Sequence, residues 1–175
     1  MGIPQQILDK IFSFEEALSQ VKKWKNLNDK LVFTNGVFDL LHPGHVTYLT
    51  DAAALGDQLL IGLNADASVK RLGKGDDRPI NNEETRAIML AALSSTSMIV
   101  LFDEDTPLSL INNLRPDVLV KGGDYAIDAK NGEPKYIVGS DELKSWNGEV
   151  KCISFLPNHS STAIINKIKG EHGKN

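Results

Sequence analysis

Cysteine is almost absent from this sequence of 175 residues. The single example, Cys152, cannot form an internal disulfide, and it falls in an apolar segment, residues 150–153, that is typical of a strand. We therefore expect a buried, inert thiol there. Long apolar runs are missing as well, because the segment 59–63 is far shorter than the roughly 20 apolar residues of a membrane-spanning helix. These absences predict a soluble protein without cysteine chemistry.

The amino-terminal segment MGIPQQILDK lacks the basic start, apolar stretch and cleavage site of a secretory signal, which favours a cytoplasmic protein. An excess of basic charge is absent too, since the net charge is −4. Nucleic-acid binding usually requires a broad basic face, so we expect no nucleic-acid partner. Four basic residues nevertheless gather in one short stretch: Lys70, Arg71, Lys74 and Arg78. This cluster predicts a small site for a few phosphates.

Apolar segments of strand length alternate along the chain with segments of helical periodicity. The predicted strands are residues 30–34, 58–63, 98–102, 117–120 and 149–154, and the predicted helices are residues 13–25, 43–55, 82–94, 107–114 and 160–169. This order predicts an α/β fold with a Rossmann-like doubly wound parallel sheet, in which ligands bind outside the carboxyl ends of the strands. We expect residues 1–27 to form a helical extension packed on the core of a domain at 28–175.

Residues at the predicted helix ends support these assignments. Ser13 and Glu16 have the spacing of a capping box, and Thr106 is a candidate cap. Gly56 is suited to close the helix at 43–55. Three isoleucines of the last predicted helix are expected to face the sheet: Ile164, Ile165 and Ile168.

The segment from Asn35 to His45 follows a predicted strand and leads into a helix. A helix amino terminus offers unpaired N–H groups and the positive end of a dipole, so it binds phosphate readily, and Gly44 leaves room for the approach. His42 and His45 are three residues apart, which places both rings on one side of the first turn. They could flank a phosphate during nucleotidyl transfer, where catalysis consists mostly of positioning and charge stabilisation. Surface or capping histidines and a zinc pair are the alternatives, although no third zinc ligand stands nearby.

Other polar residues are predicted to lie at the same edge of the sheet. Asn64 and Asp66 follow the second strand, where Asp66 has the alternative of capping a short helix. Lys121 precedes two glycines, residues 122–123, that let the backbone pass close to a ligand, although a plain turn also explains them. Residues 160–162 are hydroxyl side chains at a helix start, where they can bind phosphate or act as caps.

The segment GVFDLLHPGH matches the GxFDxxHxGH signature of the cytidylyltransferase-like family, a relative of the HIGH-motif synthetases. The resemblance implies a nucleotidyltransferase of the HIGH superfamily with three catalytic residues: His42, His45 and Lys74. It implies nucleotide-binding roles for Asn35, Gly36, Val37, Phe38, His42, Gly44, His45, Lys121, Gly123, Asp124, Ser160, Ser161 and Thr162. It implies substrate-binding roles for Asp39, Asn64, Asp66, Lys70, Arg71, Arg78 and Arg86.

Six further segments, NADASVKRL, RPI, DTP, VKGGDY, IVGSDEL and SSTAII, resemble the adenylyltransferases of ADP-heptose synthesis over residues 28–169. The resemblance implies transfer of AMP from ATP to D-glycero-β-D-manno-heptose 1-phosphate, with Mg²⁺ on the triphosphate and no metal site in the protein. It also implies a stand-alone form supplied by a separate heptose kinase, and it leaves a homodimer open. The segment 127–135 is longer than the usual link and is interpreted as a surface loop or partial lid.

Two other functions fit parts of the pattern. A cytidylyltransferase acting on glycerol phosphate or another alcohol phosphate shares the chemistry, and the contacts that choose the base are poorly visible in a sequence. A non-catalytic nucleotide sensor would keep the fold, although the intact histidines count against it. The number of polar motifs at the edge of the sheet disfavours a purely structural interaction domain.

Overall fold

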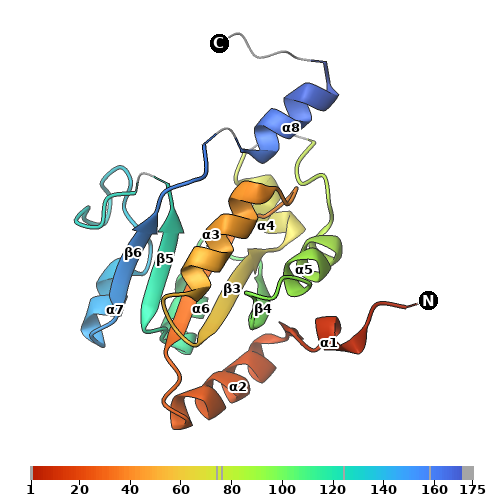
Figure 1. The fold of residues 1–175 in the computed structure, drawn as a ribbon. Coiled ribbons are helices and arrows are strands. Elements are labelled where there is room, and N and C mark those ends of the chain that lie inside the picture. The colour runs from red at the N-terminus through yellow and green to blue at the C-terminus, as the bar shows by residue number, and fades with distance from the viewer. Residues whose placement is uncertain (1, 74, 76, 124, 158, 171–175) are drawn as a thin grey trace.

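The centre of the protein is one parallel sheet, seen in a computed structural model that describes residues 2–73, 75, 77–123, 125–157 and 159–170. In spatial order the strands are β1 (Ile11–Phe12), β4 (Met98–Phe102), β3 (Gln58–Asn64), β2 (Leu31–Gly36), β5 (Val118–Gly122) and β6 (Glu149–Ile153). From β2 the chain winds outward to β4 on one side and then crosses to β5 and β6 on the other (Figure 1). The doubly wound parallel sheet predicted from the sequence is therefore confirmed.

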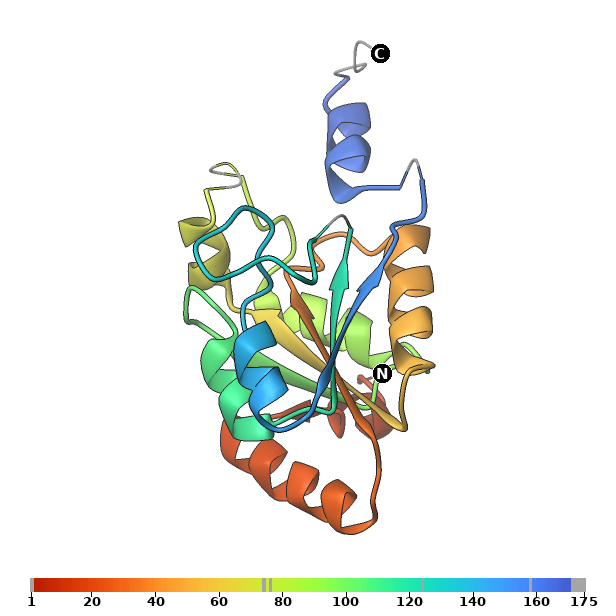
Figure 2. The ribbon, with the colours of Figure 1, turned by 90° about the vertical axis from the view of Figure 1, so that its left-hand side faces the viewer.

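Helices cover both faces of the sheet, because its central strands carry apolar side chains on both sides. One layer consists of α2 (Phe14–Asn26), α6 (Leu108–Leu114) and α7 (Ser140–Ser145), and the other consists mainly of α3 (Pro43–Ala53) and α5 (Glu83–Ala91). Phe33 and Leu49 are fully buried in the two core clusters, one on each face. Figure 2 shows the strands enclosed between these layers.

Several short elements were not predicted from the sequence. They are β1, α7 and the four-residue helix α1 (Gln5–Leu8). Strand β1 contains only two residues, and it pairs with β4 at the edge of the sheet. Elements this short leave no periodic signal in a sequence.

The predicted helix ends were partly right. The capping box of α2 is present, since the Ser13 side chain accepts from the Glu16 backbone while the Glu16 carboxylate accepts from the Ser13 N–H. The Thr106 cap was wrong, because Pro107 occupies the cap position of α6 and no side chain caps that helix. Helix α3 ends at Ala53, so Gly56 lies in the following turn and does not close the helix directly.

The prediction that three isoleucines of the last helix face the sheet was also wrong. Helix α8 (Ser161–Ile168) stands above the carboxyl ends of the strands and projects away from the body (Figures 1 and 2). Ile165 alone is buried on this helix, and Ile168 is 77% exposed. The apolar periodicity predicted the helix itself, but periodicity does not specify what covers the apolar residues of a helix.

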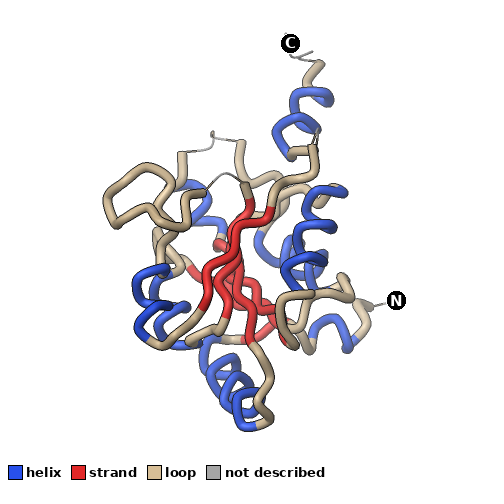
Figure 3. Tube along the Cα trace, turned by 60° about the vertical axis from the view of Figure 1, so that its left-hand side comes forward, coloured by secondary structure: helices blue, strands red, loops and turns tan. Residues whose placement is uncertain are grey.

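The order of the strands creates a switch point between β2 and β5. Their pairing extends only through Val32 with Val118 and Phe33 with Leu119, so the last residues of both strands diverge. Loops gather above this edge of the sheet (Figure 3). In doubly wound folds this is where ligands bind. No helix in the described parts of the chain combines the length and the apolar character that crossing a membrane would require.

Candidate active site

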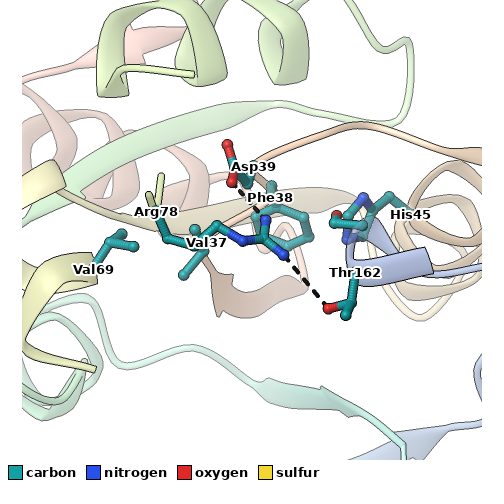
Figure 4. A pocket seen from close by; sticks show the side chains of 8 residues that line it. Val37, Phe38, Asp39, His45, Val69, Arg78 and Thr162 are labelled. Carbon is teal, nitrogen blue, oxygen red and sulfur yellow. Dashed lines mark hydrogen bonds and ion pairs between the residues drawn. The ribbon is translucent and has the colours of Figure 1, made fainter. Parts of the chain in front are cut away.

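Two cavities open at the carboxyl edge of the sheet and share a wall formed by Val37, Phe38 and His45. The first, which we name the arginine cavity, has a volume of about 330 Å³ (Figure 4). Its other lining residues are Asp39, Val69, Arg78, Ser161 and Thr162. The second, which we name the lysine cavity, has a volume of about 530 Å³ and includes Asn35, Tyr48, Asn64, Lys121, Tyr125 and Phe155. Segments far apart in the sequence therefore meet around His45.

His42 and His45 lie at the amino terminus of α3, as predicted. His42 is the cap residue, and its Nδ1 accepts from the His45 backbone N–H at 3.3 Å. The two rings stack with 3.8 Å between their centroids, and Phe38 packs against His45 with its ring tilted by 67°. Gly44 is buried beside them, where a Cβ would lie 3.0 Å from the His42 ring. His42 therefore caps the helix, which was one of the alternatives, and its ring also lies on the same side of the first turn as that of His45, as the spacing predicted.

The environment keeps both imidazoles neutral near pH 7. Burial and the neighbouring charge of His42 lower the pKa of His45 to about 4. Burial and the charge of His159 also lower the pKa of His42. A neutral imidazole carries one N–H donor, so the pair can donate hydrogen bonds to a phosphate without bringing positive charge.

Asp39 ties the first strand-end loop to the loop that carries Arg78. Its carboxylate accepts from Arg78 Nη1 at 2.7 Å and from the backbone N–H groups of Ile80 and Asn81, both at 2.9 Å. Burial raises the pKa of this carboxyl, but these hydrogen bonds outweigh the effect and hold the pKa below its usual value. Arg78 also reaches Thr162 Oγ1 at 3.5 Å (Figure 4). The substrate-binding role predicted for Asp39 remains a prediction, and the structure adds a positioning role.

Lys121 lies at the switch point and donates to Asn35 Oδ1, thereby bridging the diverging ends of β5 and β2. Burial lowers the pKa of Lys121 to about 8. Among the described residues no carboxylate pairs with its ammonium, and Nζ lies 6.0 Å from the centroid of the Tyr125 ring. A half-buried cation facing a cavity without a counter-charge is suited to an anionic ligand.

Of the predicted substrate-binding residues at positions 64–71, Asn64 lines one of the two cavities and the others line neither in the described structure. Asn64 is buried at the lysine cavity, where its Nδ2 donates to Ser68 Oγ at 2.9 Å. Asp66 is not a cap, since Ala65 holds that position in α4 (Asp66–Arg71). Lys70 and Arg71 are exposed and line neither cavity in the described structure; Arg71 pairs with Asp103 and Asp105 instead.

The three hydroxyl residues at the start of α8, residues 160–162, make different contacts. Ser160 is the cap, and its Oγ accepts from Ala163 N–H at 3.1 Å. Ser161 Oγ donates to the Leu40 carbonyl at 3.1 Å. Ser161 and Thr162 both line the arginine cavity, so capping and phosphate binding are compatible. Two predicted residues, Lys74 and Asp124, lie outside the described residues.

Phe155 is a site residue that the sequence did not reveal. Its ring covers Gly122, the last residue of β5, and the following Gly123, because a Cβ on Gly122 would lie 2.3 Å from it and one on Gly123 would lie 2.8 Å away. The ring packs against Tyr48 at 6.1 Å and is 57% exposed at the lysine cavity. The adjacent glycines were the available signal, since they indicate a close approach to the backbone.

A sequence model of the family described as Cytidylyltransferase-like matches residues 33–167. This span includes the wall that the two cavities share and the start of α8. The chain belongs to the cytidylyltransferase-like family. Among solved structures, the lipopolysaccharide core biosynthesis protein from Thermoplasma volcanium GSS1 is similar, with a TM-score of 0.56 and 25% identity. The match covers 73% of this chain and 97% of that protein.

Curated relatives of this family member include proteins named Bifunctional protein HldE. That of Methylobacillus flagellatus is 48% identical over 160 residues, which is 91% of this chain and 31% of the relative. That of Campylobacter fetus subsp. fetus is 50% identical over 161 residues, or 92% of this chain and 32% of the relative. The chain thus spans about a third of the length of the curated relatives that it matches.

Proposed function

We propose that this family member transfers AMP from ATP to D-glycero-β-D-manno-heptose 1-phosphate and releases pyrophosphate. One observation carries the proposal: the His45 wall stands between two cavities, with Lys121 in one and Arg78 in the other. Two anionic reactants can each be held by a cation while they meet at His45. The similarity to the HldE proteins supports this choice of reaction.

The chemistry of the cavities suggests where each reactant binds. The exposed rings of Tyr125 and Phe155 suit the flat face of a base, which favours the lysine cavity for the nucleoside. Arg78 suits the phosphate of the acceptor, because a guanidinium pairs well with phosphate oxygens. The hydroxyls of Ser161 and Thr162 would hold the phosphate chain.

The proposed step is a direct displacement at phosphorus. An oxygen of the heptose 1-phosphate attacks the α-phosphorus of ATP, and the bond from that phosphorus to the oxygen bridging the β-phosphate breaks. The bonding electrons leave with pyrophosphate, and no base is needed because the attacking phosphate is already ionised. Neutral His42 and His45 would donate N–H groups to the α-phosphate oxygens. Mg²⁺ would enter as the ion of the triphosphate, and these steps depend on no protein ligand for it.

The proposal also sets expectations for the surroundings of the reaction. A sugar kinase acting on the anomeric hydroxyl would supply the acceptor, and the product would serve lipopolysaccharide synthesis. We place the reaction in the cytoplasm, where ATP is available. Assembly as a homodimer stays a prediction that light scattering would check.

Pyrophosphate release by the purified protein tests the reaction. MgATP and MgCTP are each combined with heptose 1-phosphate or glycerol 3-phosphate, and the His45→Ala variant serves as the control. We expect pyrophosphate with ATP and heptose 1-phosphate, and none above the control with CTP and glycerol 3-phosphate. Turnover with CTP and glycerol 3-phosphate alone would replace the proposal with the cytidylyltransferase alternative, and nucleotide binding without turnover would indicate a sensor.

A further inference from the structure

Arg86 is the most completely buried charged residue of the described chain, with a side chain that is 0% exposed. It comes from α5 and makes three hydrogen bonds in three directions. Nε donates to the Asn81 carbonyl at 3.0 Å, Nη1 to the Val37 carbonyl at 2.8 Å, and Nη2 to Asp66 Oδ1 at 2.7 Å. Arg86 is not among the described residues that line either cavity.

The two carbonyl groups belong to the segments that form the arginine cavity. Val37 lies in the loop after β2, in the wall shared by both cavities, and Asn81 lies in the loop that carries Arg78. Asp39 joins the same two segments from the cavity side, through the bonds to Arg78, Ile80 and Asn81 described above. Asn81 Nδ2 completes the connection with a 2.8 Å bond to the Asp39 carbonyl. Arg86 therefore holds the two segments together from the interior of the protein, and Asp39 holds the same segments together from the cavity side.

The geometry of a guanidinium explains why this position requires arginine. Its donors have fixed directions, so three acceptors bound at once set the relative positions of the segments that provide them. A lysine ammonium could replace the charge but would not span both carbonyls and the carboxylate. The three hydrogen bonds of Arg86 go to two backbone carbonyls and one carboxylate of the protein itself, so these donors are not directed at a ligand.

We propose that Arg86 is a positioning residue that acts on the reaction through Arg78. By holding the loop of residues 78–81 against the end of β2, it sets the place from which Arg78 meets the acceptor phosphate. It does not itself contact the acceptor, in contrast to the direct role implied by family resemblance. The inference rests on the proposed function for the identity of the acceptor.

A double-mutant cycle between Arg86 and Arg78 tests this route. Arg86→Lys, Arg78→Ala and the double variant are compared with the wild type for the KM of heptose 1-phosphate and of ATP. Loss of a charged hydrogen bond predicts a rise of roughly ten- to a hundredfold in the acceptor KM for each single variant. If Arg86 acts through Arg78, Arg86→Lys adds less than about twofold once Arg78 is gone, while the KM for ATP changes little throughout.

The matched control is Arg115→Lys, at the carboxyl end of α6. Arg115 is exposed, lies 5.4 Å from the centroid of the Trp146 ring and lines neither cavity of the described structure. The acceptor KM of this variant should equal that of the wild type. Fully multiplicative effects of Arg86→Lys and Arg78→Ala would overturn the proposal, because they would show that Arg86 acts independently of Arg78.

Amide exchange separates this inference from the proposed function. The N–H groups of Ile80 and Asn81 donate to Asp39, so Arg86→Lys should accelerate their hydrogen exchange while Arg115→Lys leaves it unchanged. This readout needs no turnover, so it remains valid even if the wild type does not use heptose 1-phosphate. If Arg86→Lys does not fold, the milder Asp66→Asn variant, which removes only the charge partner, takes its place in both experiments. Unchanged exchange at Ile80 and Asn81 would overturn the positioning role.

Discussion

At the scale of single residues, the positive charges of the site and its neutral imidazole donors are on different side chains. His45, with a pKa near 4, is a neutral donor at physiological pH, whereas Lys121 and Arg78 supply positive charge from the two sides. Phe38 stands between the cavities with a left-handed backbone, φ 47°. Such a conformation is unfavourable for a bulky residue and persists only where the surroundings enforce it. The bonds of Asp39 and Arg86 on either side of Phe38 supply that constraint.

Replacing His45 with alanine should reduce kcat by roughly a hundred- to a thousandfold, the usual cost of removing one donor to a transition-state oxyanion. The measurement is steady-state pyrophosphate release. Thr50→Ala is the matched control, since Thr50 is exposed on the same helix and, among the described residues, its hydroxyl bonds to the Val46 carbonyl alone. Circular dichroism should show that both variants fold. A kcat within threefold of the wild type for His45→Ala, roughly 0.6 kcal/mol, would refute the role of this residue.

Lys121 gives a prediction for pH. In the free protein its ammonium loses its proton near pH 8, so the KM for ATP should be constant below that pH and rise about tenfold per unit above it. Lys121→Arg should abolish this rise, because arginine stays charged. A wild-type KM that is flat up to pH 10 would exclude an ammonium–phosphate contact here.

The same lysine should lower stability in the absence of ligand. Its pKa falls from 10.5 to about 8 on folding, so the unfolded chain binds more protons between these values and the free energy of unfolding rises with pH across that window. Below pH 8 the charge destabilises the fold by up to about 3 kcal/mol, reduced by its bond to Asn35. Lys121→Met should therefore raise the melting temperature at pH 7 while weakening ATP binding. A lower melting temperature would mean that the Asn35 bond outweighs desolvation.

At the scale of elements, the turn after α3 fixes how that helix and its histidines sit on the sheet. Gly56 lies in this turn, where a Cβ would come within 2.6 Å of the Lys30 carbonyl oxygen and 2.7 Å of Val32. Backbone at that distance cannot yield without displacing β2. Gly56→Ala should therefore destabilise the protein by about 1–3 kcal/mol, measured by urea unfolding. Gly2→Ala is the control, because nothing lies within 4 Å of its Cβ position, and equal stability of the two variants would contradict the prediction.

At the scale of the whole molecule, α8 contributes more to the site than to the core. Its connections to the body include Ser161 to the Leu40 carbonyl, Arg78 to Thr162, and an exposed ion pair between Lys169 and Asp77. Ile165 is its one buried residue. The helix therefore closes the arginine cavity while adding little to the two central clusters of apolar side chains.

Removal of residues 157–175 should consequently leave the sheet folded. We expect the loss of α8 to cost about 1.5–3 kcal/mol, the value of one buried isoleucine, while turnover falls to background because Ser161 and Thr162 are gone. Thermal unfolding and pyrophosphate release measure the two effects. A truncated protein that retains wild-type turnover would show that α8 has no part in the site.

The sequence alone was sufficient for the properties that depend on neighbouring residues. Apolar runs and helical periodicity predicted the principal strands and helices, because secondary structure follows local patterns of burial. The spacing of His42 and His45 placed both rings on one turn, and the GVFDLLHPGH segment led to the correct family. Ser13 and Glu16 formed their capping box because the interaction spans only three residues.

Only the tertiary structure decided which distant residues meet. It turned Arg86 inward to two carbonyls, directed Arg71 away from the cavities, and placed Phe155 against the two glycines at the end of β5. It also raised α8 above the sheet, where the periodicity of its isoleucines had suggested packing against it. These outcomes depend on side-chain direction and on strand order across more than a hundred residues of chain. Local sequence specifies an element and its apolar face, whereas the partner of that face depends on the packing of the whole molecule.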